Sequence, residues 1–179
     1  MHPIGSLGHD VLCHIQKTLM TRFDLACRIS QASPEPNYAF NEAREQYDSK
    51  MMIKRMIRLC PSESLRFLAV TRVDLYVPIL KFVYGLAQIE GKCALISLHR
   101  LCPRFYDKPS NLSLLLERTE KTVLHELGHT FGLTHCRNRP CVMQSSTRIT
   151  DTDEKDAEFC PTCFELIRWR IEKFGGNTP

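Results

Sequence analysis

Three histidines and one glutamate gather in the middle of the sequence, in the order His125, Glu126, His129 and His135. Residues four apart on an α-helix project to the same side, so His125 and His129 can bind one metal ion. Glu126 borders that face, where its carboxylate can reach a metal-bound water without ligating the ion. His135 would point away if the helix continued. We expect Gly132, which is free to adopt a positive φ, to end the helix and turn His135 back to the ion.

Three neutral imidazoles and an open fourth position form the ligand set of a catalytic zinc. Such a zinc lowers the pKa of a bound water toward roughly 7 and polarises a carbonyl oxygen. Glu126 is then expected to take the proton of the attacking water and return it to a leaving amine, so the implied reaction is amide-bond hydrolysis. The alternative is that the histidines only decorate a surface helix, although this spacing is rarely met by chance.

Four of the nine cysteines form two short pairs, Cys136-x4-Cys141 and Cys160-x2-Cys163. This spacing is typical of a tetrathiolate zinc site. Because Cys136 directly follows His135, anchoring its thiolate would fix the backbone that aims the third imidazole. Redox disulfides between these cysteines are the alternative interpretation.

Helical periodicity identifies the elements that must position these groups. We expect helices over residues 11–23, 48–59, 111–131 and from 161 onward. Asp48 is the predicted N-cap of the second helix, and the fourth should begin at Pro161 and turn Phe164, Ile167 and Ile171 inward. The histidine motif occupies the last two turns of the third.

Much of the rest of the first half of the sequence shows the residue patterns of strands. We expect strands near residues 25–29 and over 66–76, and a hairpin with strands 82–87 and 92–99 around the turn QIEG. The two prolines of SPEPN should interrupt regular structure. Helices mixed with strands in this way favour an α/β sheet covered by helices on at least one face.

The composition narrows the class of protein. A chain of 179 residues with 43% apolar residues is expected to form one compact domain. Its net charge of +4 is scattered, which gives no support for nucleic-acid binding. No apolar run is long enough for a membrane span, and the N-terminus lacks a signal-peptide pattern, so a cytoplasmic protein is expected. In a reducing compartment, metal ligation explains clustered cysteines better than disulfides do.

The combined signature HELGHTFGLTHCRNRPCVM…CPTC closely resembles the archaemetzincins, a metzincin-clan family of zinc peptidases. VDLYVP and FVYGLAQ, further upstream, are also similar to that family. The resemblance implies that the three histidines bind the catalytic zinc, with Glu126 as general base. It further implies a second, structural zinc held by Cys136, Cys141, Cys160 and Cys163, and Met143 as the Met-turn residue beneath the catalytic metal.

The resemblance also implies an α/β (α+β) zincin fold, in which a twisted mixed sheet packs on a long active-site helix and zinc staples a C-terminal segment. Residues 1–179 would form one peptidase domain with an upper part, 1–131, and a lower part, 132–179. Residues 92–99 would provide the edge strand that pairs with an extended peptide substrate. The 16 residues between Met143 and Cys160 are one fewer than the family spacing, and Ser145 occupies the position where other metzincins place a tyrosine ligand.

The sequence therefore predicts a monomeric zinc-dependent peptidase, with aminopeptidase-like activity suggested by the resemblance. One alternative is a catalytically latent, zinc-stabilised module that binds a peptide or protein. Another is a thiol redox protein with a single metal. The acidic run 150–156 lacks the spacing of a calcium loop and is interpreted as a solvated loop.

Overall fold

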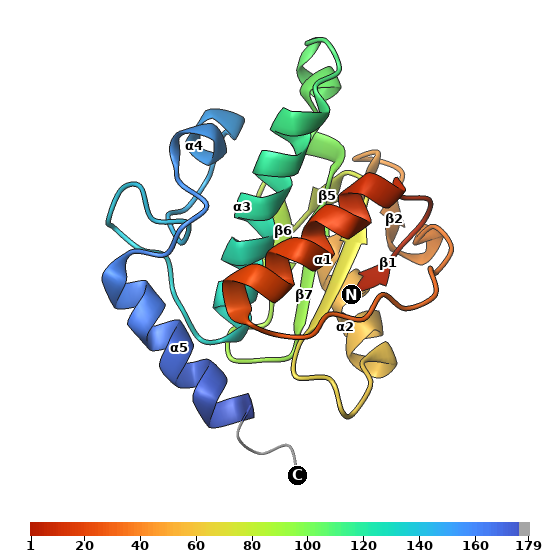
Figure 1. Cartoon of the computed structure of the whole chain (residues 1–179). Helices are drawn as coiled ribbons and strands as arrows, with labels where there is room; N and C mark the ends of the chain where they lie inside the picture. Colours follow the sequence, from red (N-terminus) through yellow and green to blue (C-terminus); the bar gives the residue numbers. More distant parts are fainter. Residues whose placement is uncertain (176–179) are drawn as a thin grey trace.

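A computed structural model describes residues 1–175 as helices packed on both faces of a mixed sheet (Figure 1). Its four strands are β1 (His2–Pro3), β4 (Phe67–Thr71), β7 (Cys93–Ser97) and β6 (Gly85–Ala87), in that spatial order. β1 and β7 run parallel to β4, whereas β6 runs antiparallel to β7. The predicted mixed α/β fold is confirmed.

Alternation along the two central strands divides the core into two layers. Leu68 and Val70 of β4 face one cluster, whereas Phe67 and Ala69 face the other, as the period of two in a strand requires. The first cluster lies beneath α1 (His9–Phe23) and α3 (Leu112–Thr130). The second lies beneath α2 (Ser49–Leu59). Helices thus cover both faces of the sheet.

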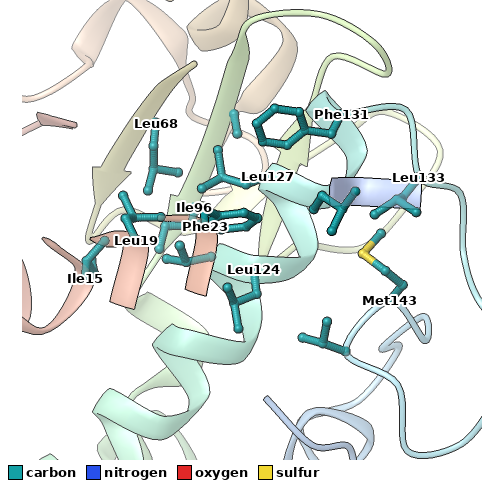
Figure 2. Packing of buried hydrophobic residues seen from close by; sticks show 14 of the residues in the cluster. Ile15, Leu19, Phe23, Leu68, Ile96, Leu124, Leu127, Phe131, Leu133 and Met143 are labelled. Atoms are coloured by element: carbon teal, nitrogen blue, oxygen red, sulfur yellow. The ribbon is translucent and has the colours of Figure 1, made fainter. Parts of the chain in front are cut away.

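The α3 layer carries the functional part of the chain. Figure 2 shows Leu124 and Leu127 of this helix, and Phe131 directly after it, packed among side chains of α1 and the sheet, with Met143 beside the C-terminal end of the helix. One buried cluster includes residues before and after residue 131, Leu133, Val142 and Ile167 among them. Residues 1–131 and 132–175 therefore share a core.

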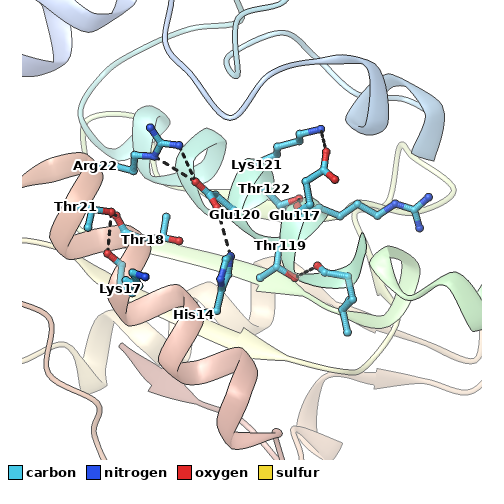
Figure 3. A network of polar contacts seen from close by, with 12 residues as sticks. His14, Lys17, Thr18, Thr21, Arg22, Glu117, Thr119, Glu120, Lys121 and Thr122 are labelled. Atoms are coloured by element: carbon cyan, nitrogen blue, oxygen red, sulfur yellow. Dashed lines mark hydrogen bonds and ion pairs between the residues drawn. The ribbon is translucent and has the colours of Figure 1, made fainter. Parts of the chain in front are cut away.

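Polar contacts also fix α1 against α3. Glu120 of α3 accepts hydrogen bonds from Arg22 at 3.1 and 3.2 Å, and His14 Nε2 lies 3.4 Å from its other oxygen (Figure 3). Both partners come from the face of α1 that also buries Ile15 and Leu19. Since Glu120 lies between the start of α3 and the histidine motif, these contacts hold the middle of α3 against α1.

The predicted helices are confirmed with small shifts at their ends. Asp48 caps α2 by accepting from the amides of Lys50 and Met51, and Asn111 caps α3 through the amide of Leu114. The last helix, α5 (Pro161–Gly175), begins at the expected proline. Its inward face was only partly predicted, because Ile167 is buried whereas Phe164 is 46% exposed.

Several strand predictions are wrong in detail. Residues 25–29 form no strand; they run irregularly beside β1, where the Ser30 amide donates to Met1 O. The run 66–76 is broken into β4 and β5 (Leu75–Tyr76), which belong to different sheets. β5 joins β3 (Gln46–Asp48) and β2 (Phe40–Asn41) in a second, three-stranded sheet.

The acidic run 150–156 is not a solvated loop. Most of it forms the short helix α4 (Ile149–Glu154), and Thr152 and Lys155 are almost completely buried. Asp153 accepts two hydrogen bonds from Arg118 of α3, at 2.6 and 2.7 Å, which holds the segment against the molecule. Within residues 1–175, no helix is both long and apolar enough to cross a membrane.

Candidate metal centres and active-site cleft

The end of α3 brings the histidines together as the sequence predicted. A Schellman arrangement closes the helix, with the Gly132 amide donating to His129 O and the Leu133 amide to Gly128 O. Gly132 has φ +88°, a left-handed conformation that glycine adopts without strain. The reversed chain carries His135 to ring-centroid distances of 5.3 Å from His125 and 5.0 Å from His129.

Hydrogen bonds fix the tautomers of the two helical histidines. His125 Nδ1 lies 2.9 Å from Val142 O, and His129 Nδ1 lies 2.7 Å from Leu133 O. A carbonyl oxygen only accepts, so each Nδ1 must carry its proton and each neutral ring keeps a lone pair on Nε2. Burial favours this neutral form, because it lowers the pKa of both histidines.

The two Nε2 atoms lie 3.1 Å apart, so two lone pairs face each other. This arrangement is unfavourable unless a cation lies between them. A tetrahedral zinc with bonds of about 2.0–2.1 Å would separate its nitrogen ligands by roughly 3.3 Å. One nitrogen from each of the three histidines lies within 4.8 Å of the others, so these residues fit a zinc ion.

The four clustered cysteines also converge. Their Sγ atoms all lie within 4.8 Å of one another, and Cys136 Sγ is 3.8 Å from Cys160 Sγ. A tetrahedral zinc with Zn–S bonds of about 2.3 Å would place its sulfurs roughly 3.8 Å apart. All four are free thiols, and the backbone amide of Cys163, at the start of α5, lowers the pKa of Cys160 to about 7. Their spacing fits zinc and not a pair of disulfides.

The segment around Met143 connects the two clusters. Val142 O accepts from His125, and Met143 O accepts from the Cys136 amide at 3.0 Å. Met143 is fully buried under the end of α3 (Figure 2). Its sulfur occupies the space that a Cβ at Gly128 would need. The glycine inside the histidine motif therefore allows the methionine to approach the helix.

Glu126 is buried next to the imidazoles at the base of a cleft of about 810 Å³. Burial raises the pKa of its carboxyl group to about 8, and the positive charge of Lys155 opposes this shift. Gly85 of β6 makes room for it, because a Cβ there would lie 2.6 Å from Glu126 Cγ. Gly85 and Lys155 are cleft residues that the sequence interpretation missed. Gly85 lies in the FVYGLAQ segment that resembles the family, whereas no pattern distinguished Lys155.

The prediction that residues 92–99 form the edge strand for substrate pairing is wrong. β7 lies inside the sheet between β4 and β6, so residues 92–99 cannot form its edge. The edge strand next to β7 is β6, and residues 80–87 form one wall of the cleft. Residues 145–147, Thr152 and Lys155 line it as well, together with the histidines and Glu126.

Comparisons with known proteins agree with this geometry. The profile of peptidase family M54 matches residues 10–169. An archaemetzincin of Methanocaldococcus jannaschii is 38% identical over 170 residues, which cover 95% of this chain and 92% of the relative. The crystal structure of archaemetzincin from Archaeoglobus fulgidus, complexed with malonate, superimposes with a TM-score of 0.80 at 30% identity, covering 92% of this chain and 97% of that one.

A zinc-dependent peptidase from Methanocorpusculum labreanum superimposes with a TM-score of 0.78 at 28% identity, over 93% of this chain and 98% of that structure. The agreement therefore extends well beyond the signature at residues 125–163 to almost the whole fold. The family match includes both groups of metal-binding side chains. This chain belongs to peptidase family M54, the archaemetzincins, and is a zinc metallopeptidase.

Proposed function

We propose that the protein hydrolyses peptide bonds in this cleft, with His125, His129 and His135 as ligands of a catalytic zinc and Glu126 as general base. The main support is the pair of Nε2 lone pairs facing each other at 3.1 Å, beside a buried carboxyl group that does not belong to the ligand set. When bound there, zinc supplies Lewis acidity to the substrate carbonyl and to a water molecule.

The protein groups around the zinc position transfer the protons and orient the ligands. Glu126 accepts a proton from the attacking water and donates it to the leaving amine. Val142 O and Leu133 O orient the imidazoles through their Nδ1 protons, which keeps both Nε2 atoms directed at one point.

We further propose that a substrate backbone pairs with the free edge of β6. This strand hydrogen-bonds to β7 on one side only, and its residues line the cleft. An extended peptide added there would pass above Glu126, because Gly85 contacts that residue. The upper part, 1–131, and the lower part, 132–179, then act as one peptidase domain, with a second, structural zinc bound by the four cysteines.

Peptide digestion and metal analysis test this proposal together. The zinc-loaded protein should contain about two zinc ions per chain and cleave members of a peptide library, detected by mass spectrometry. Glu126→Gln should keep both metals and lower kcat by roughly 10²–10⁴-fold. Glu165→Gln, on the exposed side of α5, is the matched control and should behave as wild type. Full activity in Glu126→Gln would overturn the general-base assignment.

The other candidate activities give different results in the same assays. Aminopeptidase-like cleavage stays a prediction, and it requires that acetylation of the peptide N-terminus abolish hydrolysis. A latent binding module would carry both metals, bind peptides and cleave none. A redox protein would contain one zinc and a Cys160–Cys163 disulfide, whereas both thiols are free in the structure.

A further inference from the structure

Lys155 is a buried cation that the proposed hydrolysis does not use. It follows α4 directly, is only 4% exposed, and lines the same cleft as Glu126. Its ammonium group donates one hydrogen bond, to Gln144 O at 3.0 Å. Among residues 1–175, no carboxylate lies within ion-pair distance of its Nζ.

An ammonium group in this position needs an anion. Moving a charge out of water without a partner is costly, and buried charges in proteins are normally paired. Lys155 has three N–H donors, and the Gln144 carbonyl satisfies one of them. The neighbouring Glu126 is the only acidic residue that lines the cleft, and the proposed reaction requires its carboxyl group to exchange protons.

One hydroxyl group of the same cleft also lacks a partner. Within the described part of the chain, Ser146 Oγ has no hydrogen-bond partner. Ser146 lines the cleft with Lys155 and lies two residues after Gln144, to which Lys155 donates. A ligand carboxylate has two oxygens and can accept from both groups.

Contacts between α4 and α3 hold Lys155 beside the catalytic residues. Asp153 of α4 accepts two hydrogen bonds from Arg118 of α3. Burial and the positive charge of Lys155 both lower the pKa of His129, and the same charge opposes the raised pKa of Glu126, so the ammonium group lies close to both. A carboxylate bound by Lys155 would therefore belong to a substrate residue next to the scissile bond.

We propose that Lys155, supported by the hydroxyl group of Ser146, forms a carboxylate-binding subsite in the cleft beside Glu126. This inference rests on the proposed peptidase function and adds a substrate class to it. The favoured substrates are peptides in which a residue next to the scissile bond carries an aspartate or glutamate side chain, or is the C-terminal residue with a free carboxylate.

The protonation state of Lys155 agrees with this role. Burial lowers the pKa of its ammonium group to about 8, and the nearby Glu126 carboxylate opposes the shift. A group with that pKa is mostly cationic at pH 7. A bound carboxylate would favour the charged form further, so binding and protonation support each other.

Matched peptides test the preference and identify its source. One pair differs only by glutamate or glutamine next to the scissile bond, with an amidated C-terminus. The second pair has a neutral residue there, ending in a free acid or an amide. A charge-assisted hydrogen bond predicts a preference of roughly 10–100-fold in kcat/KM for the carboxylate member of at least one pair. Equal values in both pairs would overturn the inference.

Variants then assign the preference to the subsite. In Lys155→Met the ratio within the preferred pair should fall to about 1, whatever the absolute rate, and Lys155→Arg should restore part of it. Ser146→Ala should reduce the ratio by a few fold. A Lys155→Met variant with an unchanged ratio would contradict the assignment. Thermal melting and zinc content show whether each variant is folded.

A binding measurement separates this inference from the proposed function. Zinc-loaded Glu126→Gln protein is titrated by calorimetry with the same peptide pairs. A lower Kd for the carboxylate peptides supports the subsite even if the wild-type protein cleaves nothing, in which case only the peptidase proposal fails. Cleavage of neutral peptides without any preference in rate or binding removes the subsite and leaves the peptidase proposal intact.

Discussion

The backbone amide of Cys136 donates to the carbonyl oxygen of Met143 at 3.0 Å, one residue after the third histidine of the motif. This hydrogen bond joins the cysteine cluster to the floor of the histidine cluster. Val142, the neighbour of Met143, holds His125 through its own carbonyl oxygen. The two groups of candidate metal ligands therefore share one short stretch of backbone.

We predict that removing one thiol from the cysteine cluster weakens metal binding at the histidines. Cys163→Ser removes a thiol at the start of α5 and should release the backbone that carries Cys136 and His135. Zinc affinity at the histidine site should fall by about tenfold or more, as expected for a lost supporting contact. Stepwise chelator titration measures both sites. Cys13→Ser, an exposed position on α1, is the control. An unchanged histidine site in Cys163→Ser would show that the two centres are independent.

Gly85 should be required for the position of Glu126. An alanine Cβ there would lie 2.6 Å from Glu126 Cγ and 2.7 Å from Leu95 O, so either the carboxylate or β6 must shift. Displacement of a reacting group by about 1 Å can cost roughly 100-fold, so Gly85→Ala should lower kcat by 10- to 100-fold and keep both zinc ions. Gly8→Ala, where a Cβ meets no atom within 4 Å, is the matched control. Equal kcat values in the two variants would refute the steric argument.

The stability of the turn at Gly132 should depend on which residue occupies position 132. Its φ of +88° costs an L-residue about 1–2 kcal/mol, with asparagine better tolerated than alanine. Gly132→Ala should therefore lower the free energy of unfolding by about that amount, and it should weaken zinc binding because His135 follows the turn. Gly132→Asn should lower the free energy of unfolding and the zinc affinity by less than Gly132→Ala does. Urea denaturation and zinc titration provide the two measurements, and a reversed order of the variants would contradict the explanation.

The ion pair between Asp74 and Arg100 should make stability depend on acid pH. Burial alone would raise the pKa of Asp74, but hydrogen bonds from Arg100 and Gln46 outweigh it and hold the pKa below 3.8. A folded-state pKa below the unfolded value stabilises the protein above about pH 4, and this contribution is lost as the pH falls through the folded value.

Asp74→Asn should therefore lower the free energy of unfolding by about 1–3 kcal/mol at pH 7 and by progressively less below pH 4. Urea denaturation between pH 2.5 and 7 measures the difference from wild type. Asp24→Asn, at an exposed position, should show no such trend. A difference that is constant across this pH range would exclude the ion pair as its cause.

The parts of the fold that were predicted correctly rest on local rules. The bounds of α2 and α3 follow from periodicity, from the caps Asp48 and Asn111, and from Gly132. The convergence of the histidines follows from helix geometry and one turn. Each of these needs only interactions between residues close in sequence, which is why the sequence alone was sufficient.

The errors concern contacts between distant segments. The position of β7 in the sheet depends on which strands flank it. Its sequence, CALIS, does indicate an interior position, because an uncharged strand buried on both faces is typical of the middle of a sheet. The composition of the acidic run 150–156 suggested solvent exposure, but α3 supplies Arg118 and Lys121 as partners. The same packing of α4 on α3 places Lys155 in the cleft, so no local sequence pattern could identify it.

The alternation along β4 and β7 has a practical consequence for protein engineering. The hydrophobic layer beneath α2 is built from side chains on the opposite face of the sheet from α3 and its histidines. A fluorophore or immobilisation tag attached to the outer surface of α2 would therefore lie on the far side of the sheet from the histidines, whereas repacking the layer itself would reach Val83 and Leu86 of the cleft wall.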